Sequence, residues 1–201
     1  MKIKIRFSGR GGQGIKFLGS VLVKVAMEAN YYATLSIDYT PSVRGGPIFC
    51  DVILSSDPIS YPFCDEDGDI FIAIDQKGIE RASDCIYENT ISFIDANTVA
   101  NPEEIIKKGK LFRIPITKLA DENKLTKSAN IISLGFLSEF LNSNGKIKLI
   151  NEYYHNVFNT MPERTRDNNF RSFELGKTLF NDFKESDYFS VFKKSPNKFM
   201  S

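Results

Sequence analysis

Residues 3–15 read Ile-Lys-Ile-Arg-Phe-Ser-Gly-Arg-Gly-Gly-Gln-Gly-Ile, and they give the strongest indication of the fold. An apolar run at residues 3–7 leads into a loop with four glycines in six residues, Gly9 to Gly14, and an amphipathic segment follows. This order predicts a strand, a glycine loop and a helix. Glycine permits close backbone approach, and a helix that begins after such a loop directs free N–H groups into the gap. The loop is therefore suited to a phosphate or another anion.

The glycine loop matches neither of two well-known nucleotide motifs in full. Its spacing fits G-x-G-x-x-G, but only Glu28 and Asp38 are available as the acidic residue expected about 20 positions later. No Gly-Lys-Ser/Thr follows, so the loop is not a Walker motif. A loop that only lets a helix pack tightly on a strand is the alternative to ligand binding.

Outward from the loop, short apolar runs alternate with amphipathic segments. The unbroken run at residues 70–74 is typical of a central parallel strand buried on both faces. We therefore expect an α/β fold of three layers, with a mostly parallel sheet flanked by helices. Further strands are predicted at residues 32–37, 48–55, 90–94 and 111–114, and helices at 15–30, 76–87, 117–123, 128–141, 146–160 and 166–183.

Length and composition limit the classes of protein to consider. The chain has 201 residues and is 42% hydrophobic, which fits one domain, expected at residues 1–185, with residues 186–201 as a C-terminal tail or partner-binding arm. The net charge of +1 argues against nucleic-acid or membrane binding as the main role. No apolar run reaches the roughly 18 residues of a membrane span, and no signal peptide is recognised, so a cytoplasmic location is expected.

The cysteines and phenylalanines allow only general expectations. Three widely spaced cysteines lack the spacing of an iron–sulfur or zinc site and are predicted to be buried or free thiols. Phenylalanines in the last third could either form an exposed face for a partner or fill a core: Phe158, Phe170, Phe173, Phe180, Phe183, Phe189, Phe192 and Phe199.

A second glycine-containing loop runs from Tyr39 to Pro47 and contains Arg44, Gly45 and Gly46. The guanidinium group of Arg44 is suited to a carboxylate or a phosphate. If the first two strands are neighbours in the sheet, both loops lie at the same edge, where Arg10 and Arg44 face one anion. A structural salt bridge is the alternative for Arg44.

Candidate catalytic groups are sparse. The lone histidine, His155, lies on a polar helix and is predicted to be solvated, and Ser8 is not in a G-x-S-x-G elbow. Asp69 and Asp75 flank the run at 70–74 and are predicted to act as caps or turn residues. Other acidic residues have no obvious partner in the sequence: Asp38, Asp51 and Asp57. The chain has an architecture for holding a group, but no visible catalytic machinery.

Several motifs, taken in order, resemble the gamma subunit of 2-oxoacid:ferredoxin (acceptor) oxidoreductases over residues 3–180. Arg-Gly-Gly followed later by Tyr-Pro resembles the 2-oxoglutarate branch, whereas Pro47 departs from its usual pattern. The motifs are Gly9-Arg10-Gly11-Gly12-Gln13-Gly14, Tyr39-x-Pro41-Ser42-x-Arg44-Gly45-Gly46, Asp51-Val52-Ile53-x-Ser55, Ile59-x-Tyr61-Pro62, Asp69-Ile70, Asn130-Ile131-Ile132-x-Leu134-Gly135 and Asn169-x-x-x-Phe173-x-x-Gly176.

The resemblance implies a complex that converts a 2-oxoacid and coenzyme A into acyl-CoA, carbon dioxide and reduced ferredoxin. Thiamine diphosphate, Mg²⁺ and [4Fe-4S] clusters are then held by alpha- and beta-type partner subunits, and a small ferredoxin-like delta subunit is a further candidate partner. This chain would bind none of these cofactors and would be inactive alone. Ferredoxin or a similar carrier would accept the electrons.

The resemblance also gives a hypothesis for the two loops, namely that they hold or gate coenzyme A. The alternative is that both loops pack against a partner subunit. Two other identities stay open: the small subunit of an indolepyruvate- or pyruvate-type enzyme, and a stand-alone nucleotide-binding protein. The candidate contact residues are Gly9, Arg10, Gly11, Gly12, Gln13, Gly14, Arg44, Gly45 and Gly46, with no catalytic or metal-binding residue among them.

Overall fold

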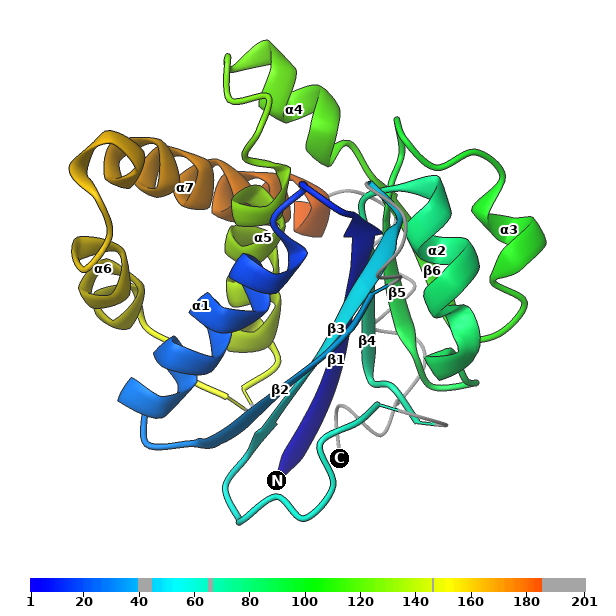
Figure 1. Ribbon diagram of the computed structural model, residues 1–201, viewed down its shortest axis with the longest axis horizontal. Helices are drawn as coiled ribbons and strands as arrows, with labels where there is room; N and C mark the ends of the chain where they lie inside the picture. Colours follow the sequence, from blue (N-terminus) through cyan, green and yellow to red (C-terminus); the bar gives the residue numbers. More distant parts are fainter. Residues whose placement is uncertain (40–44, 65–66, 146, 186–201) are drawn as a thin grey trace.

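The computed structural model describes residues 1–39, 45–64, 67–145 and 147–185, so the expected tail at 186–201 lies outside the described residues (Figure 1). The strands are β1 (Lys2–Arg10), β2 (Tyr32–Tyr39), β3 (Pro47–Ser55), β4 (Ile70–Ala73), β5 (Ile91–Asp95) and β6 (Lys110–Ile114). The helices are α1 (Ile15–Glu28), α2 (Gln76–Ala82), α3 (Pro102–Ile105), α4 (Ile116–Glu122), α5 (Ala129–Ser143), α6 (Asn151–Asn159) and α7 (Glu163–Glu185), with a 3₁₀ turn, η1 (Ser83–Cys85).

The described strands form one six-stranded sheet in the order β2-β3-β1-β4-β5-β6. Strand β3 runs antiparallel to both β1 and β2, while β1, β4, β5 and β6 pair in parallel. The expected α/β fold is thus confirmed, with one reversed strand in the sheet. The assumption that the first two strands are neighbours is wrong, because β3 follows β2 through a short connection and inserts between β2 and β1.

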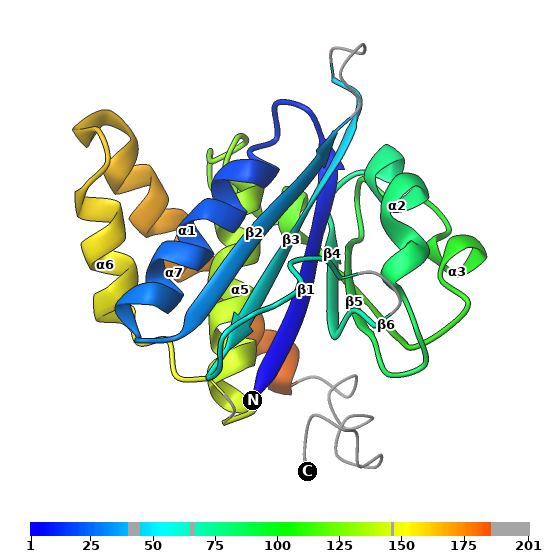
Figure 2. The same cartoon turned by 60° about the horizontal axis from the view of Figure 1, so that its bottom comes forward.

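Helices cover both faces of the sheet, which makes the three expected layers (Figures 1 and 2). Helices α1, α5, α6 and α7 lie over one face, and α2 and α3 over the other. Strand β4 shows the alternation clearly, because Ile70 and Ile72 join the larger hydrophobic cluster while Phe71 and Ala73 join the smaller one. Burial on both faces explains why this run is continuously apolar. None of the described helices is long and apolar enough to span a bilayer.

The described phenylalanines of the last third fill a core. Phe158, Phe173 and Phe180 are fully buried, and Phe170 and Phe183 pack partly buried against the same cluster. Their rings meet mostly edge to face, as in the contact of Phe136 with Phe180 at 5.4 Å between centroids. Phe189, Phe192 and Phe199 lie outside the described residues. The alternative of an exposed phenylalanine face is therefore wrong for the described members of the set.

Helices α5 and α7 cross at two glycines, which lets their backbones come unusually close. A Cβ atom at Gly135 would lie 2.0 Å from the carbonyl oxygen of Phe173, and one at Gly176 would lie 2.0 Å from that of Ile132. Both obstacles are backbone atoms, so neither side can yield by a change of rotamer. The crossing therefore requires glycine at both positions.

We expect Gly176→Ala to lower the free energy of unfolding by about 1–3 kcal/mol, because the added methyl group overpacks the crossing. Urea denaturation followed by circular dichroism measures this change. The matched control is Asn181→Ala at an exposed position of the same helix, which gains helix propensity without a clash. Equal midpoints for wild type and Gly176→Ala would contradict the close crossing.

Candidate functional site

The glycine loop leads from β1 to α1, as the sequence predicts, but Gly9 and Arg10 are still part of the strand, which ends two residues later than expected. Gly14 has a φ of +74° and precedes the helix, and Gly12 has a φ of +96°. Both conformations lie in the left-handed region that favours glycine. No described side chain caps α1, so the positive end of the helix dipole faces the loop.

Hydrogen bonds to neighbouring segments and within the loop fix its shape. The N–H of Gly11 donates to the carbonyl oxygen of Gly46 at 2.8 Å, which brings the two predicted loops together. The N–H of Arg10 donates to Oε1 of Gln13 at 2.6 Å, and Nδ2 of Asn130 donates to the carbonyl oxygen of Gly14 at 3.2 Å. The loop thus has a defined shape before any ligand binds.

The two loops meet for a reason that sequence reasoning did not foresee. The register of β1 against β3 pairs Gly9 with Ile48 and Arg10 with Pro47, so the β2–β3 connection reaches the same edge although β2 is not next to β1. Gly45 and Gly46 lie beside Gly11, because a Cβ atom on Gly11 would be 3.4 Å from the Cα of Gly45. Arg44 lies outside the described residues.

Asp75 positions the half-exposed side chain of Arg10 beside the loop. Its Oδ2 lies 3.4 Å from Nε of Arg10, while its Oδ1 accepts a hydrogen bond from the N–H of Lys77 at 3.0 Å. Asp75 is therefore the N-cap of α2, which confirms the capping role predicted for it. One carboxylate serves both contacts, and so links α2 to the glycine loop.

An open pocket of about 470 Å³ lies beside the loop. It combines the cations of Arg10 and Lys16 with the N-terminal end of α1, and has an apolar wall. This combination suits an anionic ligand that also has an apolar part. Its lining residues are Arg10, Gly12, Gly14, Ile15, Lys16, Phe17, Ser20 and Ile48.

The described residues place no acid–base or nucleophilic pair at this pocket. Its one hydroxyl group, on Ser20, donates to the carbonyl oxygen of Lys16 at 2.9 Å. His155 is exposed on α6, and Ser8 is fully buried in β1. No group of three or more His, Cys, Asp or Glu side chains suited to a metal ion occurs in the part of the chain that the structure describes. The arrangement can bind and orient a ligand.

Asn130 is the loop contact that sequence reasoning missed. It lies 116 residues from Gly14, near the beginning of α5, and its only signal in the sequence was membership of the Asn130-Ile131-Ile132 motif. A Cβ atom at Gly14 would lie 2.3 Å from Nδ2 of Asn130. The amide side chain therefore occupies the space that glycine leaves free.

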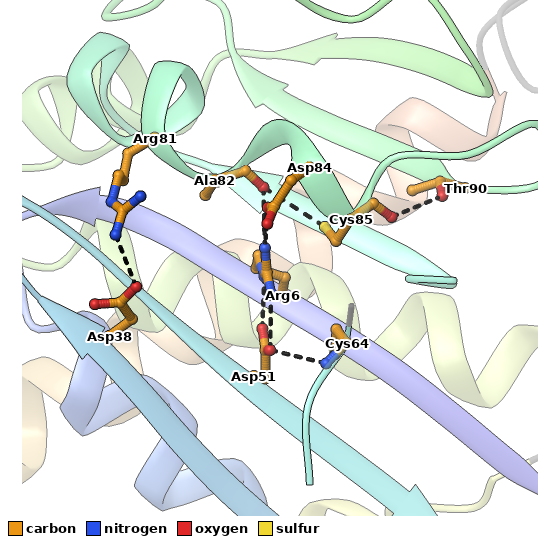
Figure 3. Close-up of polar contacts among 9 residues, drawn as sticks. All are labelled: Arg6, Asp38, Asp51, Cys64, Arg81, Ala82, Asp84, Cys85 and Thr90. Carbon is orange, nitrogen blue, oxygen red and sulfur yellow. Dashed lines mark hydrogen bonds and ion pairs between the residues drawn. The ribbon is translucent and has the colours of Figure 1, made fainter. Parts of the chain in front are cut away.

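A buried ion pair lies behind the site, on the face of the sheet covered by α2 (Figure 3). Nε and Nη2 of Arg6 donate to Oδ1 and Oδ2 of Asp51 at 2.6 and 2.9 Å. The guanidinium group also pairs with Asp84 and lies 4.1 Å from the centroid of the Phe49 ring. Burial lowers the pKa of Arg6, but its hydrogen bond to Asp51 and the neighbouring negative charges, those of Asp51 and Asp84 among them, together outweigh burial, so the pKa is raised above its ordinary value. Sequence reasoning gave Asp51 no partner.

All three cysteines are buried free thiols, in agreement with the sequence. Burial raises the pKa of Cys50 and Cys64 and raises the pKa of Cys85 to about 12.

We expect none of the three thiols to react with Ellman's reagent within minutes at pH 8 in the native protein, because the thiolate is the nucleophile. Unfolding in guanidinium chloride should release three reactive thiols. Rapid labelling of the native protein would contradict this burial.

Fold and site together define an α/β domain with a preformed, anion-suited glycine loop. Residues 4–179 match the family model described as pyruvate ferredoxin/flavodoxin oxidoreductase, so the chain belongs to this family. The family predicted from the ordered motifs is thereby confirmed. Among its relatives, a protein of Methanocaldococcus jannaschii named 2-oxoglutarate synthase subunit KorC is 30% identical over 88% of this chain and 92% of its own length.

Solved structures show the same fold. The gamma subunit of a keto/oxoacid ferredoxin oxidoreductase from Geobacter sulfurreducens superposes with a TM-score of 0.70 at 23% identity, covering 90% of this chain and 98% of that one. A 2-oxoglutarate:ferredoxin oxidoreductase chain from Magnetococcus marinus, solved with 2-oxoglutarate, coenzyme A and succinyl-CoA, gives 0.78 at 24% identity over 92% of this chain and 32% of its own. The chain thus has the fold of a gamma subunit and matches an equivalent part of a longer oxidoreductase chain.

Proposed function

We propose that this chain is the gamma subunit of a 2-oxoglutarate:ferredoxin oxidoreductase complex. The observation that carries the proposal is the match to a 2-oxoglutarate synthase subunit over nearly the whole of both chains. The Arg-Gly-Gly and Tyr-Pro motifs support the same branch. The complex would convert 2-oxoglutarate, coenzyme A and oxidised ferredoxin into succinyl-CoA, carbon dioxide and reduced ferredoxin.

In this proposal the chain works only together with its partners. Alpha- and beta-type subunits hold thiamine diphosphate, Mg²⁺ and [4Fe-4S] clusters, which supply the decarboxylation and electron-transfer chemistry. A ferredoxin-like delta subunit is a further candidate partner, and the complex is expected in the cytoplasm. Residues 1–185 act as one gamma-type domain, and residues 186–201 are a tail or an arm for a partner.

Within the complex we assign the glycine loop to the phosphates of coenzyme A. Support comes from the cationic groups of Arg10 and Lys16, the beginning of α1 and the apolar wall of the adjoining pocket. Coenzyme A offers phosphates and a long, less polar pantetheine arm, which suits such a mixed surface. Arg44, Gly45 and Gly46 would complete the contact from the second loop. Packing of the loops on a partner subunit is the competing role.

Purification of the tagged chain under anaerobic conditions tests the subunit assignment. The eluate is examined by mass spectrometry and assayed for coenzyme A-dependent viologen reduction with 2-oxoglutarate, pyruvate and indolepyruvate. We expect alpha- and beta-type chains in the eluate and the highest kcat/KM with 2-oxoglutarate. Preference for another acid would overturn the branch, and a chain that purifies without these partners would overturn the subunit role.

The coenzyme A contact predicts a separate kinetic effect. Arg10→Ala and Arg44→Ala should each raise the KM for coenzyme A by about 10- to 100-fold with kcat little changed, because a charge-assisted hydrogen bond is worth about 1.5–3 kcal/mol. Initial rates of the assembled complex at varied coenzyme A measure the change. Arg171→Ala, at an exposed position of α7, is the matched control. If KM is unchanged in both loop variants, the loops do not hold coenzyme A.

A further inference from the structure

A second cavity, of about 330 Å³, lies where the beginnings of α5 and α7 meet. Lys127, Ser128 and Asn130 line it from the start of α5, and Met161 and Asn169 line it from the side of α7. Asn130 and Asn169 each open one of the sequence motifs that the glycine loop does not explain. The cavity therefore collects residues from distant parts of the chain to which no role has been assigned.

The second cavity and the pocket beside the glycine loop are neighbours. Phe17 of α1, which is 39% exposed, lines both of them. Asn130 lines the second cavity, and its Nδ2 donates to the carbonyl oxygen of Gly14, which lines the pocket beside the loop, at 3.2 Å. One extended ligand can therefore reach from the glycine loop past Phe17 into the second cavity.

The charge along this path favours a ligand with several negative groups. The lining residues of the pocket and of the second cavity include three cations, Arg10, Lys16 and Lys127, and no acidic residue. Lys16 and Lys127 are exposed and form no ion pair within the described part of the chain, whereas Arg10 lies beside Asp75. The cavity thus adds a cation, Lys127, to the two beside the loop, and suits an additional anionic group.

The other side chains of the second cavity suit a flat, heteroaromatic ring. The ring of Phe17 and the thioether of Met161 offer apolar, polarisable surfaces. Nδ2 of Asn169 donates to Sδ of Met161 at 3.2 Å, and sulfur is only a weak acceptor. Oγ of Ser128 makes no hydrogen bond to a described residue. These polar groups are placed to bind the edge of a base that stacks on an aromatic side chain.

We propose that the second cavity holds the 3′-phosphoadenosine end of coenzyme A, with the adenine ring against Phe17 and the 3′-phosphate paired with Lys127. This inference rests on the proposed function, which brings coenzyme A to the glycine loop. In coenzyme A the diphosphate lies between the nucleotide and the pantetheine arm, so a diphosphate at the loop leaves the nucleotide within reach of the second cavity. The thiol has to approach the cofactor of a partner subunit, so the nucleotide is the end that stays on this chain.

The test compares coenzyme A with dephospho-coenzyme A, which lacks the 3′-phosphate, as substrates of the assembled complex. Lys127→Ala should raise the KM for coenzyme A by about 10-fold and leave the KM for dephospho-coenzyme A within twofold, because only the former carries the group that Lys127 binds. The matched control is Lys24→Ala, an exposed cation of α1 outside both sets of lining residues, which should change neither KM.

A second variant tests the position of the adenine ring. Phe17→Leu keeps an apolar side chain but removes the aromatic face, so it should raise the KM for coenzyme A and for dephospho-coenzyme A alike, by about 10-fold. Met27→Leu, at an exposed position near the other end of α1, is the matched control and should change neither KM. Unchanged melting temperatures exclude misfolding of each variant.

The outcomes separate this inference from the proposed function. If Lys127→Ala affects both substrates equally, or neither, the 3′-phosphate does not lie at Lys127 and the inference is wrong. If Phe17→Leu changes neither KM, the adenine ring does not lie against Phe17, and the inference is again wrong. In both cases a raised KM in the Arg10→Ala complex would leave the assignment of the glycine loop standing. A wild-type complex without 2-oxoglutarate-dependent activity would overturn the proposed function itself.

Discussion

The close backbone contact at the end of β1 is the constraint on which the site depends. A Cβ atom on Gly78 of α2 would lie 2.5 Å from the nitrogen of Gly9, and one on Gly9 would lie 2.8 Å from Oε1 of Gln13. Glycine at position 78 lets α2 rest directly on Gly9, and glycine at position 9 leaves room for the side chain of Gln13. From there the loop leads into α1 on the opposite face of the sheet, so its shape is set by all three layers.

Polar contacts extend this constraint across the molecule. Asp75 caps α2 and reaches Arg10, and Asn130 connects α5 to Gly14. On the α2 face the Arg6–Asp51 pair joins β1 to β3 and, through the N–H of Cys64, holds the segment that follows β3. A buried ion pair of this kind contributes little net stability, but removing one partner would leave an uncompensated charge. We therefore regard it as a device that specifies position.

The proposed division between a binding domain and catalytic partner subunits agrees with what these contacts build. The pocket beside the loop offers cations, backbone N–H groups and an apolar wall, and its lining residues provide no acid–base pair. In the proposed complex, such a surface can raise the local concentration of an anionic substrate and orient it, while the partner subunits supply the bond-making groups.

Local patterns predicted much of this fold. The strand, glycine loop and helix at residues 3–27, the central strand at 70–74 and the capping role of Asp75 are set by periodicity and by nearby residues, and all are present. The position of β3 between β2 and β1 was not predictable in this way, because it depends on pairing between distant segments. The same holds for Asn130 and for the Arg6–Asp51 pair, whose partners are 116 and 45 residues apart. Helix α3, of four residues, is too short to produce a periodic signal.

Reconstitution with and without this chain tests whether it is a working subunit that assists the use of coenzyme A. The alpha- and beta-type chains are prepared anaerobically with their cofactors, and 2-oxoglutarate-dependent, coenzyme A-dependent viologen reduction is measured before and after this chain is added. The account predicts that the added chain restores turnover at physiological coenzyme A, and that the apparent KM for coenzyme A falls as the complex forms. Full activity with an unchanged KM in its absence would contradict the account.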